Sequence, residues 1–246
     1  MQGKLEMPVI AFVSPKGGAG KSTSAVILAT QLAEELAGQG SVAIIDADPN
    51  KPVSQWADRP GKPENLIVIS DISEKTIIDE IENAAGQVTF TIVDLEGTAS
   101  VMVAYAISRA DLVIIPTQGS QLDSSEAGKA VRLIRQQEKA FNKSIPYAVL
   151  YTRTSAAIRP RTLRHIQEAF RQHGIYAFQT QLHEREAFRA IFSFGGTLSN
   201  LPLKDVANLG AAMLNAQAFT SETVAMLRAL EEPEQPLEEA FEGMVA

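Results

Sequence analysis

The sequence predicts a single α/β domain built on a doubly wound, mainly parallel β-sheet. Short apolar runs alternate along the chain with helical segments, which is the order of elements in β–α–β folds. Several of these runs are continuously apolar, as in strands that helices cover on both faces. A glycine-rich turn joins the first strand to the first helix. Right-handed crossovers are therefore expected between the parallel strands.

The first half of the chain contains apolar runs separated by a turn and a loop. Pro8–Val13 is a short apolar strand, and an apolar helix from Ser22 to about Ala37 follows it. Ser41–Ile45 is a strand that ends in acidic residues, and the three prolines of Asn50–Pro63 predict a loop. The next elements are a strand at Leu66–Ser70, a helix at Glu74–Ala84 and a strand at Phe90–Val93.

The second half repeats the pattern. Strands are expected at Leu112–Pro116, Tyr147–Tyr151 and Tyr176–Thr180, with a helix near Arg161–His173. The chain after Thr220 is expected to form a helix with an acidic, mobile end. The sequence thus predicts one domain over residues 1–220 and a C-terminal helix and tail over residues 221–246.

Composition excludes several classes of function. The absence of cysteine excludes disulfides, iron–sulfur clusters and thiolate zinc sites. The three histidines, His165, His173 and His183, show no metal-ligand spacing. The N-terminus lacks the apolar segment of a secretion signal, and the longest apolar runs have the length of strands. We therefore expect a soluble, cytoplasmic protein with no membrane partner.

Charge is distributed unevenly. A net charge of −7 argues against a simple nucleic-acid-coating protein. Residues 129–189 nevertheless hold twelve Lys and Arg against four acidic residues, a local net charge of +8 that leaves −15 for the rest of the chain. This basic stretch is either a set of solvated helix faces or a surface that binds a polyanion.

The most informative segment is the glycine-rich turn Ser14–Thr23. Glycines allow backbone N–H groups to approach phosphate oxygens closely, and a helix N-terminus favours an anion. In such a phosphate-binding loop (P-loop), Lys21 is expected to reach the β- and γ-phosphates and the Ser22 hydroxyl to ligate Mg²⁺. Pro15 replaces the usual first glycine, and Lys16 adds a second lysine. The segment predicts a P-loop NTPase fold, with a ligand-free glycine turn as the alternative.

The run Lys16-Gly17-Gly18-Ala19-Gly20-Lys21-Ser22-Thr23 resembles the deviant P-loop of the ParA/MinD superfamily of ATPases. The resemblance extends through about Leu203. It implies that ATP and Mg²⁺ are the ligands, and that hydrolysis is weak until a partner stimulates it. It also implies a homodimer formed with ATP, in which Lys16 reaches the nucleotide bound to the partner subunit. Lys16 and Lys21 are therefore catalytic candidates.

The strand end at Asp46 to Asn50 supplies carboxylates of the kind that a P-loop needs. It resembles the second motif of the family, which implies that Asp46 lies near Mg²⁺ and that Asp48 orients the hydrolytic water. Members commonly have Gln where this chain has Asn50. The alternative is that the two aspartates only begin a turn, as paired aspartates after a strand often do.

A further acidic strand end is Phe90–Gly97. An apolar strand that ends in Asp94 is typical of a Walker B element, and Asp94 is an expected Mg²⁺-shell residue. The spacing Asp94-x-x-Gly97 is the one by which a glycine N–H senses a γ-phosphate in switch loops. Glu96 could be a surface residue.

Other features indicate the branch of the superfamily. No helix-turn-helix segment precedes the P-loop, and the glutamate-rich C-terminus is unlike a membrane-targeting helix. The stretches Asp46–Trp56, Pro116–Asp123 and His183–Arg185 resemble ParA relatives associated with conjugative DNA transfer. This resemblance implies a short ParA-type, nucleoid-associated protein that binds DNA non-specifically. With a centromere-binding type of adaptor protein, it would partition or position a plasmid, chromosome region or other cargo.

The expected DNA contacts belong to the basic stretch. Arg185 aligns roughly with a DNA-contacting arginine of ParA proteins. The full candidate set is Arg159, Arg161, Arg164 and Arg185. Trp56 is as readily a packing residue as a partner contact. Two other functions stay open: an adaptor ATPase that recruits a conjugation or secretion complex, and a positioning ATPase whose cargo is a protein cluster.

Overall fold

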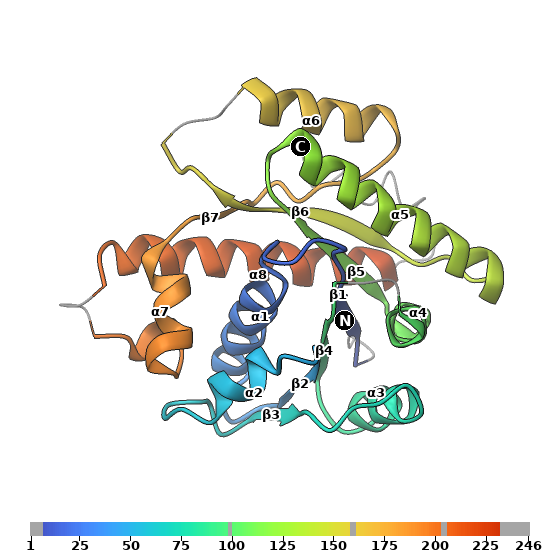
Figure 1. Cartoon of the computed structure of the whole chain (residues 1–246). Coiled ribbons are helices and arrows are strands. Elements are labelled where there is room, and N and C mark those ends of the chain that lie inside the picture. Colours follow the sequence, from blue (N-terminus) through green and yellow to red (C-terminus); the bar gives the residue numbers. More distant parts are fainter. Residues whose placement is uncertain (1–6, 98–99, 158–160, 203–205, 232–246) are drawn as a thin grey trace.

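Helices cover both faces of a central sheet in the computed structural model, which describes residues 7–97, 100–157, 161–202 and 206–231 (Figure 1). Within these ranges seven strands follow the order β3-β2-β4-β1-β5-β6-β7, and every strand pair is parallel. The strands are β1 Val9–Phe12, β2 Val42–Ala47, β3 Leu66–Ile69, β4 Phe90–Leu95, β5 Leu112–Thr117, β6 Tyr147–Thr154 and β7 Leu182–His183.

Two hydrophobic cores lie between the sheet and its two helical layers. One layer consists of α1 Lys21–Glu35, α2 Pro52–Ala57, α7 Glu186–Phe194 and α8 Leu209–Glu231. A short 3₁₀ helix, Leu198–Asn200, lies between α7 and α8 in the chain. The other layer consists of α3 Ile77–Ala85, α4 Val101–Arg109, α5 Gln121–Phe141 and α6 Arg161–Gln172. Alternate residues of β1 enter opposite cores, Ile10 and Phe12 on one side and Val9 and Ala11 on the other. The doubly wound parallel fold predicted from the sequence is confirmed.

The expected loop Asn50–Pro63 contains the short helix α2. Pro52 stands in its first turn, where a missing N–H costs nothing. The backbone N–H and hydroxyl of Ser54 both donate to Asp46 at 2.8 Å, which fixes this helix to the end of β2. Trp56 is buried and its indole N–H donates to the carbonyl of Gly196 at 3.0 Å, so it is a packing residue.

The prediction of a strand at Tyr176–Thr180 is wrong. This segment makes one isolated bridge, between Ala177 and Val149, and the edge strand is β7 instead. The reason is a competing acceptor: the carboxylate of Glu222 on α8 accepts the backbone N–H groups of residues 179 and 180 at 2.7 and 2.8 Å. These donors are therefore unavailable to a sheet ladder.

The C-terminal helix is longer than the sequence indicated. It begins at Leu209, so position 220 lies inside α8, which packs against α1. Helices α4, α5 and α7 also occupy segments for which no element was expected. The acidic end, residues 232–246, lies outside the described residues. None of the helices in the described part of the chain combines the length and apolar character that a membrane crossing requires.

Candidate nucleotide-binding site

A pocket lies at the carboxyl ends of β1, β2 and β4, where open parallel sheets bind ligands. It gathers residues from three separate predicted motifs. Its lining residues are Pro15, Gly17, Gly18, Gly20, Lys21, Ser22, Thr23, Asp48, Asn50, Glu96, Gly97 and Arg153. The predicted residues Lys16, Ala19, Asp46 and Asp94 are not among them: the last three are buried, and Lys16 pairs with Asp123.

The P-loop wraps around the N-terminus of α1. Gly18 and Gly20 have φ values of 74° and 95°, in the left-handed region that side chains disfavour. No side chain caps α1 at Gly20 and no acid stands in its first turn, so its backbone N–H groups remain available to an anion. Thr152 holds the loop from behind by donating to the carbonyl of Ala19 at 2.7 Å. Lys21 is buried, with 7% of its surface exposed.

Two buried carboxylates stand beneath the pocket. Asp46 and Asp94 face each other in the β2–β4 register, and both are fully buried. Both oxygens of Asp94 and one oxygen of Asp46 have no hydrogen-bond partner among the described residues. Burial raises the pKa of Asp94 to about 7, helped by the charge of Asp46 and opposed by Ser22 and Lys21.

A buried carboxylate without a partner raises the free energy of the folded protein, and a cation beside it offsets this penalty. The described residues contain no cluster of three or more His, Cys, Asp or Glu that could hold a metal by themselves. Mg²⁺ usually keeps waters and phosphate oxygens among its ligands, so it does not need such a cluster. The residues present therefore fit Mg²⁺: Ser22, Asp46 and Asp94 would hold it, and it would neutralise the charge of bound phosphates.

Gly97 lies directly against the P-loop. A Cβ atom at this position would stand 3.1 Å from the carbonyl oxygen of Ser14 and 3.5 Å from the Lys21 Nζ. Only glycine allows this approach without displacing the backbone of the loop. The backbone of residue 97 is thus held against the P-loop.

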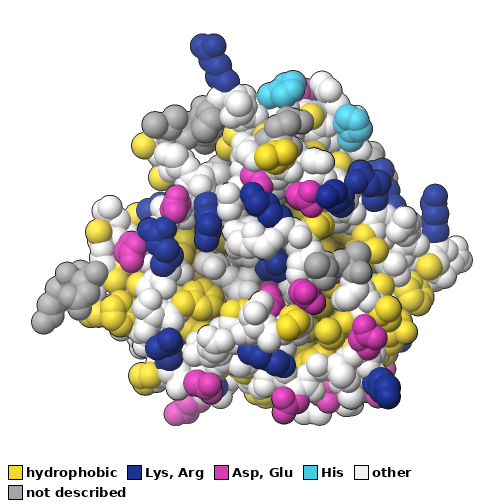
Figure 2. Space-filling model, viewed as in Figure 1, with side chains coloured by type: hydrophobic (Ala, Val, Ile, Leu, Met, Phe, Trp, Pro, Cys, Tyr) yellow, Lys and Arg dark blue, Asp and Glu magenta, His cyan; other side chains and the backbone are white. Residues whose placement is uncertain are grey.

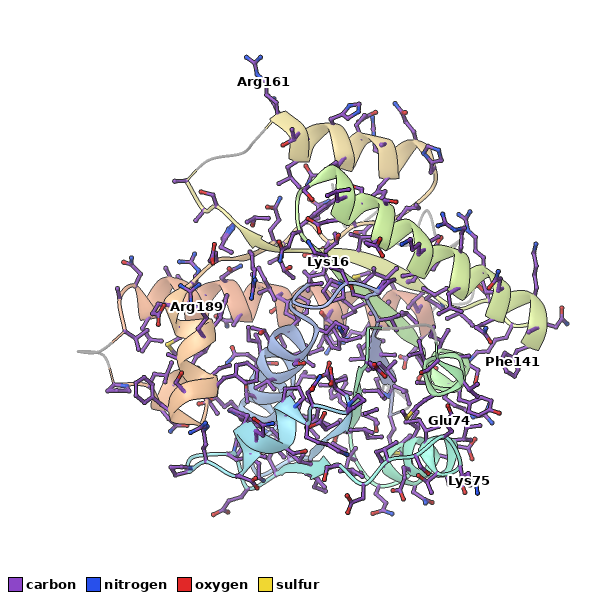
Figure 3. The ribbon with its side chains drawn as sticks, viewed as in Figure 1. Lys16, Glu74, Lys75, Phe141, Arg161 and Arg189 are labelled. Carbon is purple, nitrogen blue, oxygen red and sulfur yellow. The ribbon has the colours of Figure 1, made fainter. Side chains whose placement is uncertain are left out.

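Asp48 and Lys16 both have partners within the chain. Asp48 Oδ1 accepts the backbone N–H and side-chain amide of Asn50 at 2.8 and 3.0 Å, which gives Asn50 a role in orienting this carboxylate. The ammonium group of Lys16 donates to Asp123 at the start of α5 (Figure 3). Burial works to raise the pKa of Asp123, but hydrogen bonds from Lys16 and Ser120 hold it below its ordinary value.

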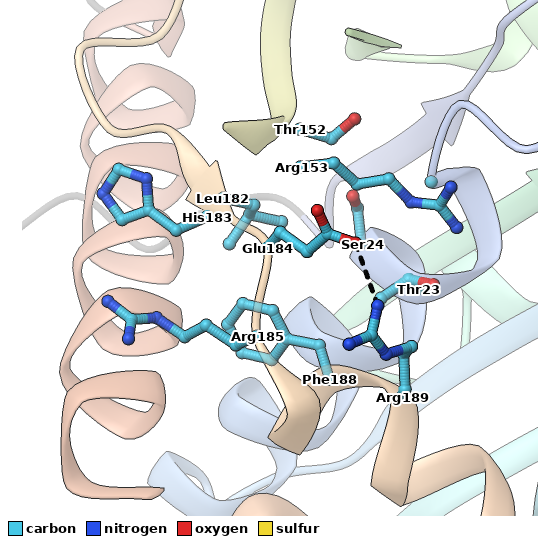
Figure 4. A pocket seen from close by; sticks show the side chains of 11 residues that line it. Thr23, Ser24, Thr152, Arg153, Leu182, His183, Glu184, Arg185, Phe188 and Arg189 are labelled. Carbon is cyan, nitrogen blue, oxygen red and sulfur yellow. Dashed lines mark hydrogen bonds and ion pairs between the residues drawn. The ribbon is translucent and has the colours of Figure 1, made fainter. Parts of the chain in front are cut away.

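A second pocket adjoins the P-loop, between the end of β6 and the β7–α7 corner (Figure 4). Arg153, which lines both pockets, sits at a bulge of β6 with φ 52°. Arg189 forms ion pairs of 2.9 Å with Glu184 and with Glu186. The lining residues are Gly20, Thr23, Ser24, Thr152, Arg153, Leu182, His183, Glu184, Arg185, Phe188 and Arg189. Sequence reasoning did not mark Ser24, Leu182, Phe188 and Arg189 of this wall, because no local motif contains them.

The predicted DNA-contacting arginines do not share one helical layer. Arg161 and Arg164 are exposed on α6, whereas Arg185 is half-buried at the start of α7, across the sheet (Figure 1). Arg159 lies outside the described residues. Basic side chains are spread over the visible face rather than gathered in one patch (Figure 2).

Comparisons with known proteins give the family. A family model described as VirC1 protein matches residues 7–232. Protein ParA of Rhizobium radiobacter is 40% identical over 213 residues, which cover 87% of this chain and 94% of that protein. Protein virC1 of Rhizobium rhizogenes is 29% identical over 190 residues, which cover 75% of this chain and 80% of that protein.

The fold is similar to that of solved structures. An ATP complex of McdA from Cyanothece superposes with a TM-score of 0.69 at 15% identity, covering 89% of this chain and 97% of that one. At that identity the likeness shows the fold alone. The family match, the relatives and the fold together confirm the resemblance read from the P-loop. The chain belongs to the VirC1 family, within the ParA/MinD superfamily of P-loop ATPases.

Proposed function

We propose that this protein dimerises on MgATP, binds DNA without sequence preference and so positions a plasmid, a chromosome region or another cargo. The observation that carries the proposal is a pair of buried carboxylates with three unpartnered oxygens, one on Asp46 and two on Asp94, beside an uncapped P-loop. A cation beside these oxygens and an anion at the P-loop would satisfy both groups, and MgATP supplies the two together.

The predicted site residues have distinct roles in this proposal. The backbone of Lys16 to Thr23 cradles the phosphates, and Lys21 contacts the β- and γ-phosphates. Ser22, Asp46 and Asp94 hold Mg²⁺, which neutralises phosphate charge when bound. Asp48 orients the attacking water, and the Gly97 N–H detects the γ-phosphate. The second pocket, with the apolar ring of Phe188, receives the base.

Lys16 is proposed to act across the dimer, which requires it to leave Asp123. We expect Lys16→Ala to bind MgATP as the wild type does and to remain monomeric, because the contact it loses belongs to the partner's nucleotide. Asp123→Asn, which weakens the hold on Lys16, is expected to favour the dimer at lower ATP concentrations. Sedimentation velocity with MgATP checks both variants, and a dimeric Lys16→Ala protein would remove the cross-subunit role.

DNA binding is the second half of the proposal. The dimer doubles the number of basic contacts, and non-specific affinity grows steeply with the phosphates neutralised. We expect binding with MgATP and little with MgADP, with a log–log salt slope of roughly −0.9 per phosphate. The double reversal Arg161→Glu with Arg164→Glu is expected to weaken binding to all sequences alike while MgATP binding survives. Fluorescence anisotropy on two unrelated duplexes at several salt concentrations measures both effects.

Arg185 could contact either DNA or the nucleotide, because it lines the pocket beside the P-loop. One variant separates these two roles. The proposal assigns it to DNA, so Arg185→Glu should lose DNA and keep MgATP. If this variant loses MgATP binding instead, Arg185 belongs to the nucleotide pocket.

If the wild-type ATP dimer does not bind DNA at low salt, the DNA half of the proposal is wrong, and the adaptor ATPase is the function that remains. Binding to DNA would also account for association with the nucleoid.

A further inference from the structure

Glu96 occupies a position that matches Asp48 on the neighbouring strand. Ala47 and Leu95 are partners in the parallel register of β2 and β4 and are the last residues of these strands, and Asp48 and Glu96 follow them directly. Each comes two residues after a buried aspartate, Asp46 or Asp94. Two adjacent strands therefore each place a second carboxylate just beyond their carboxyl ends, and both line the same pocket.

Both members of this second pair line the phosphate pocket, and no other carboxylate lines it among the described residues. Asp48 is restrained, because one of its oxygens accepts two hydrogen bonds from Asn50. Glu96 is half-buried and makes no hydrogen bond or ion pair within the described part of the chain. The close approach of Gly97 to the P-loop fixes the backbone on which Glu96 stands. A free carboxylate is thus held at the pocket wall, with the buried cation Lys21 in the same wall.

We propose that Glu96 is a catalytic residue of ATP hydrolysis, which accepts a hydrogen bond from the attacking water and orients it together with Asp48. This inference rests on the proposed ATPase function. Two acceptors on one water fix the direction of its lone pair more tightly than one acceptor does. Correct orientation of a bound reactant is worth about 10²-fold in rate for a misplacement of about 1 Å.

In the step itself, the oriented lone pair of the water oxygen forms a bond to the γ-phosphorus. The bond between that phosphorus and the oxygen bridging to the β-phosphorus breaks, and its electron pair stays on ADP. One water hydrogen remains on the oxygen that attacked, and the other passes to a γ-phosphoryl oxygen. ATP and water thus give ADP and H₂PO₄⁻, and Glu96 ends in the charge state in which it began.

The test compares kcat with the Kd for MgATP in Glu96→Gln. This variant keeps the size of the side chain, but its neutral amide oxygen accepts a hydrogen bond more weakly than the carboxylate does. We expect kcat to fall about 10²-fold, and the Kd for MgATP to stay within about threefold of the wild type. Glu96→Asp, which keeps the carboxylate, should recover part of the lost kcat. In the Asp48→Ala background, Glu96→Gln should cost much less than it does alone, because both residues act on one water. Glu74→Gln, at an exposed glutamate away from the pocket, is the matched control and should leave kcat unchanged (Figure 3).

Each other outcome has a distinct meaning. If the wild type turns over ATP and Glu96→Gln does so within about threefold of its rate, the inference is wrong and the proposed function stands. If Glu96→Gln loses MgATP binding while the bound enzyme turns over normally, Glu96 holds the nucleotide or its metal, and the inference is again wrong. If the wild type itself shows no hydrolysis with or without DNA, the proposed ATPase function fails, and the role of Glu96 fails with it.

Discussion

Replacing Lys21 by alanine is expected to abolish MgATP binding. Lys21 is buried in the wall of the phosphate pocket, and it is the only lysine that lines this pocket among the described residues. Hydrogen bonds to charged groups contribute about 1.5–3 kcal/mol each, and a lysine between two phosphates makes more than one. We therefore expect a loss of affinity of at least about 10²-fold, equivalent to about 3 kcal/mol.

Isothermal titration calorimetry with MgATP measures this loss directly. Lys75→Ala removes an exposed lysine far from the pocket and is the matched control (Figure 3). Thermal unfolding of the apo protein shows that the variant is folded. A Lys21→Ala protein that binds MgATP within about threefold of the wild type would mean that the triphosphate does not lie in the P-loop.

Replacing Asp48 by alanine is expected to stall hydrolysis and to leave MgATP bound. One Asp48 oxygen is occupied by Asn50 and the other is free to accept a hydrogen bond from water at the pocket wall. The loss of a positioned acceptor typically costs 10²-fold or more in rate, about 3 kcal/mol of the barrier. The expected species is a long-lived ATP dimer, visible by sedimentation and by the absence of phosphate release.

The geometry also defines a rival role for Asp48, because its two bonds to Asn50 form a turn of the kind that aspartate often makes. Asn50→Ala removes the side-chain bond and keeps both the backbone bond and the carboxylate, so it tests how far the Asn50 amide orients Asp48. If Asp48→Ala hydrolyses ATP at the wild-type rate, Asp48 is a turn residue only. A fall in both variants of similar size would show that Asn50 is needed to orient Asp48.

Local signals in the sequence were enough to predict the P-loop turn and the strands of the sheet other than its edge strand β7. Continuous apolar runs predicted β1, β2, β4 and β5, since strands covered on both faces have no polar alternation. The helices α4 and α5 also had a usable local signal. Each begins at a serine, Ser100 or Ser120, whose hydroxyl accepts a backbone N–H three residues later.

Other features depend on contacts between distant segments, which local patterns do not contain. The segment Tyr176–Thr180 has the composition of a strand, but Glu222 takes its backbone donors from 42 residues or more away. The ion pair of Lys16 with Asp123 joins positions 107 residues apart. Trp56 packs because Gly196, 140 residues further on, accepts its indole N–H.

The candidate site divides in the same way. Motifs on single loops located Lys21, Ser22 and Asp94, because a P-loop and a strand end are local in sequence. The second pocket needs the end of β6 and the start of α7 together, and only the folded chain places Arg153 beside Arg189. Glu96 required the strand register, since its importance lies in its position beside Asp48.

The oligomeric state of the wild-type protein in the two nucleotide states tests the central claim most directly. Sedimentation velocity at one protein concentration, in MgATP and then in MgADP, measures whether the wild-type protein changes its oligomeric state with the nucleotide. We predict a dimer in MgATP and a monomer in MgADP. A monomer in both nucleotides, at concentrations where MgATP saturates the site, would contradict the claim that this protein is switched by its nucleotide.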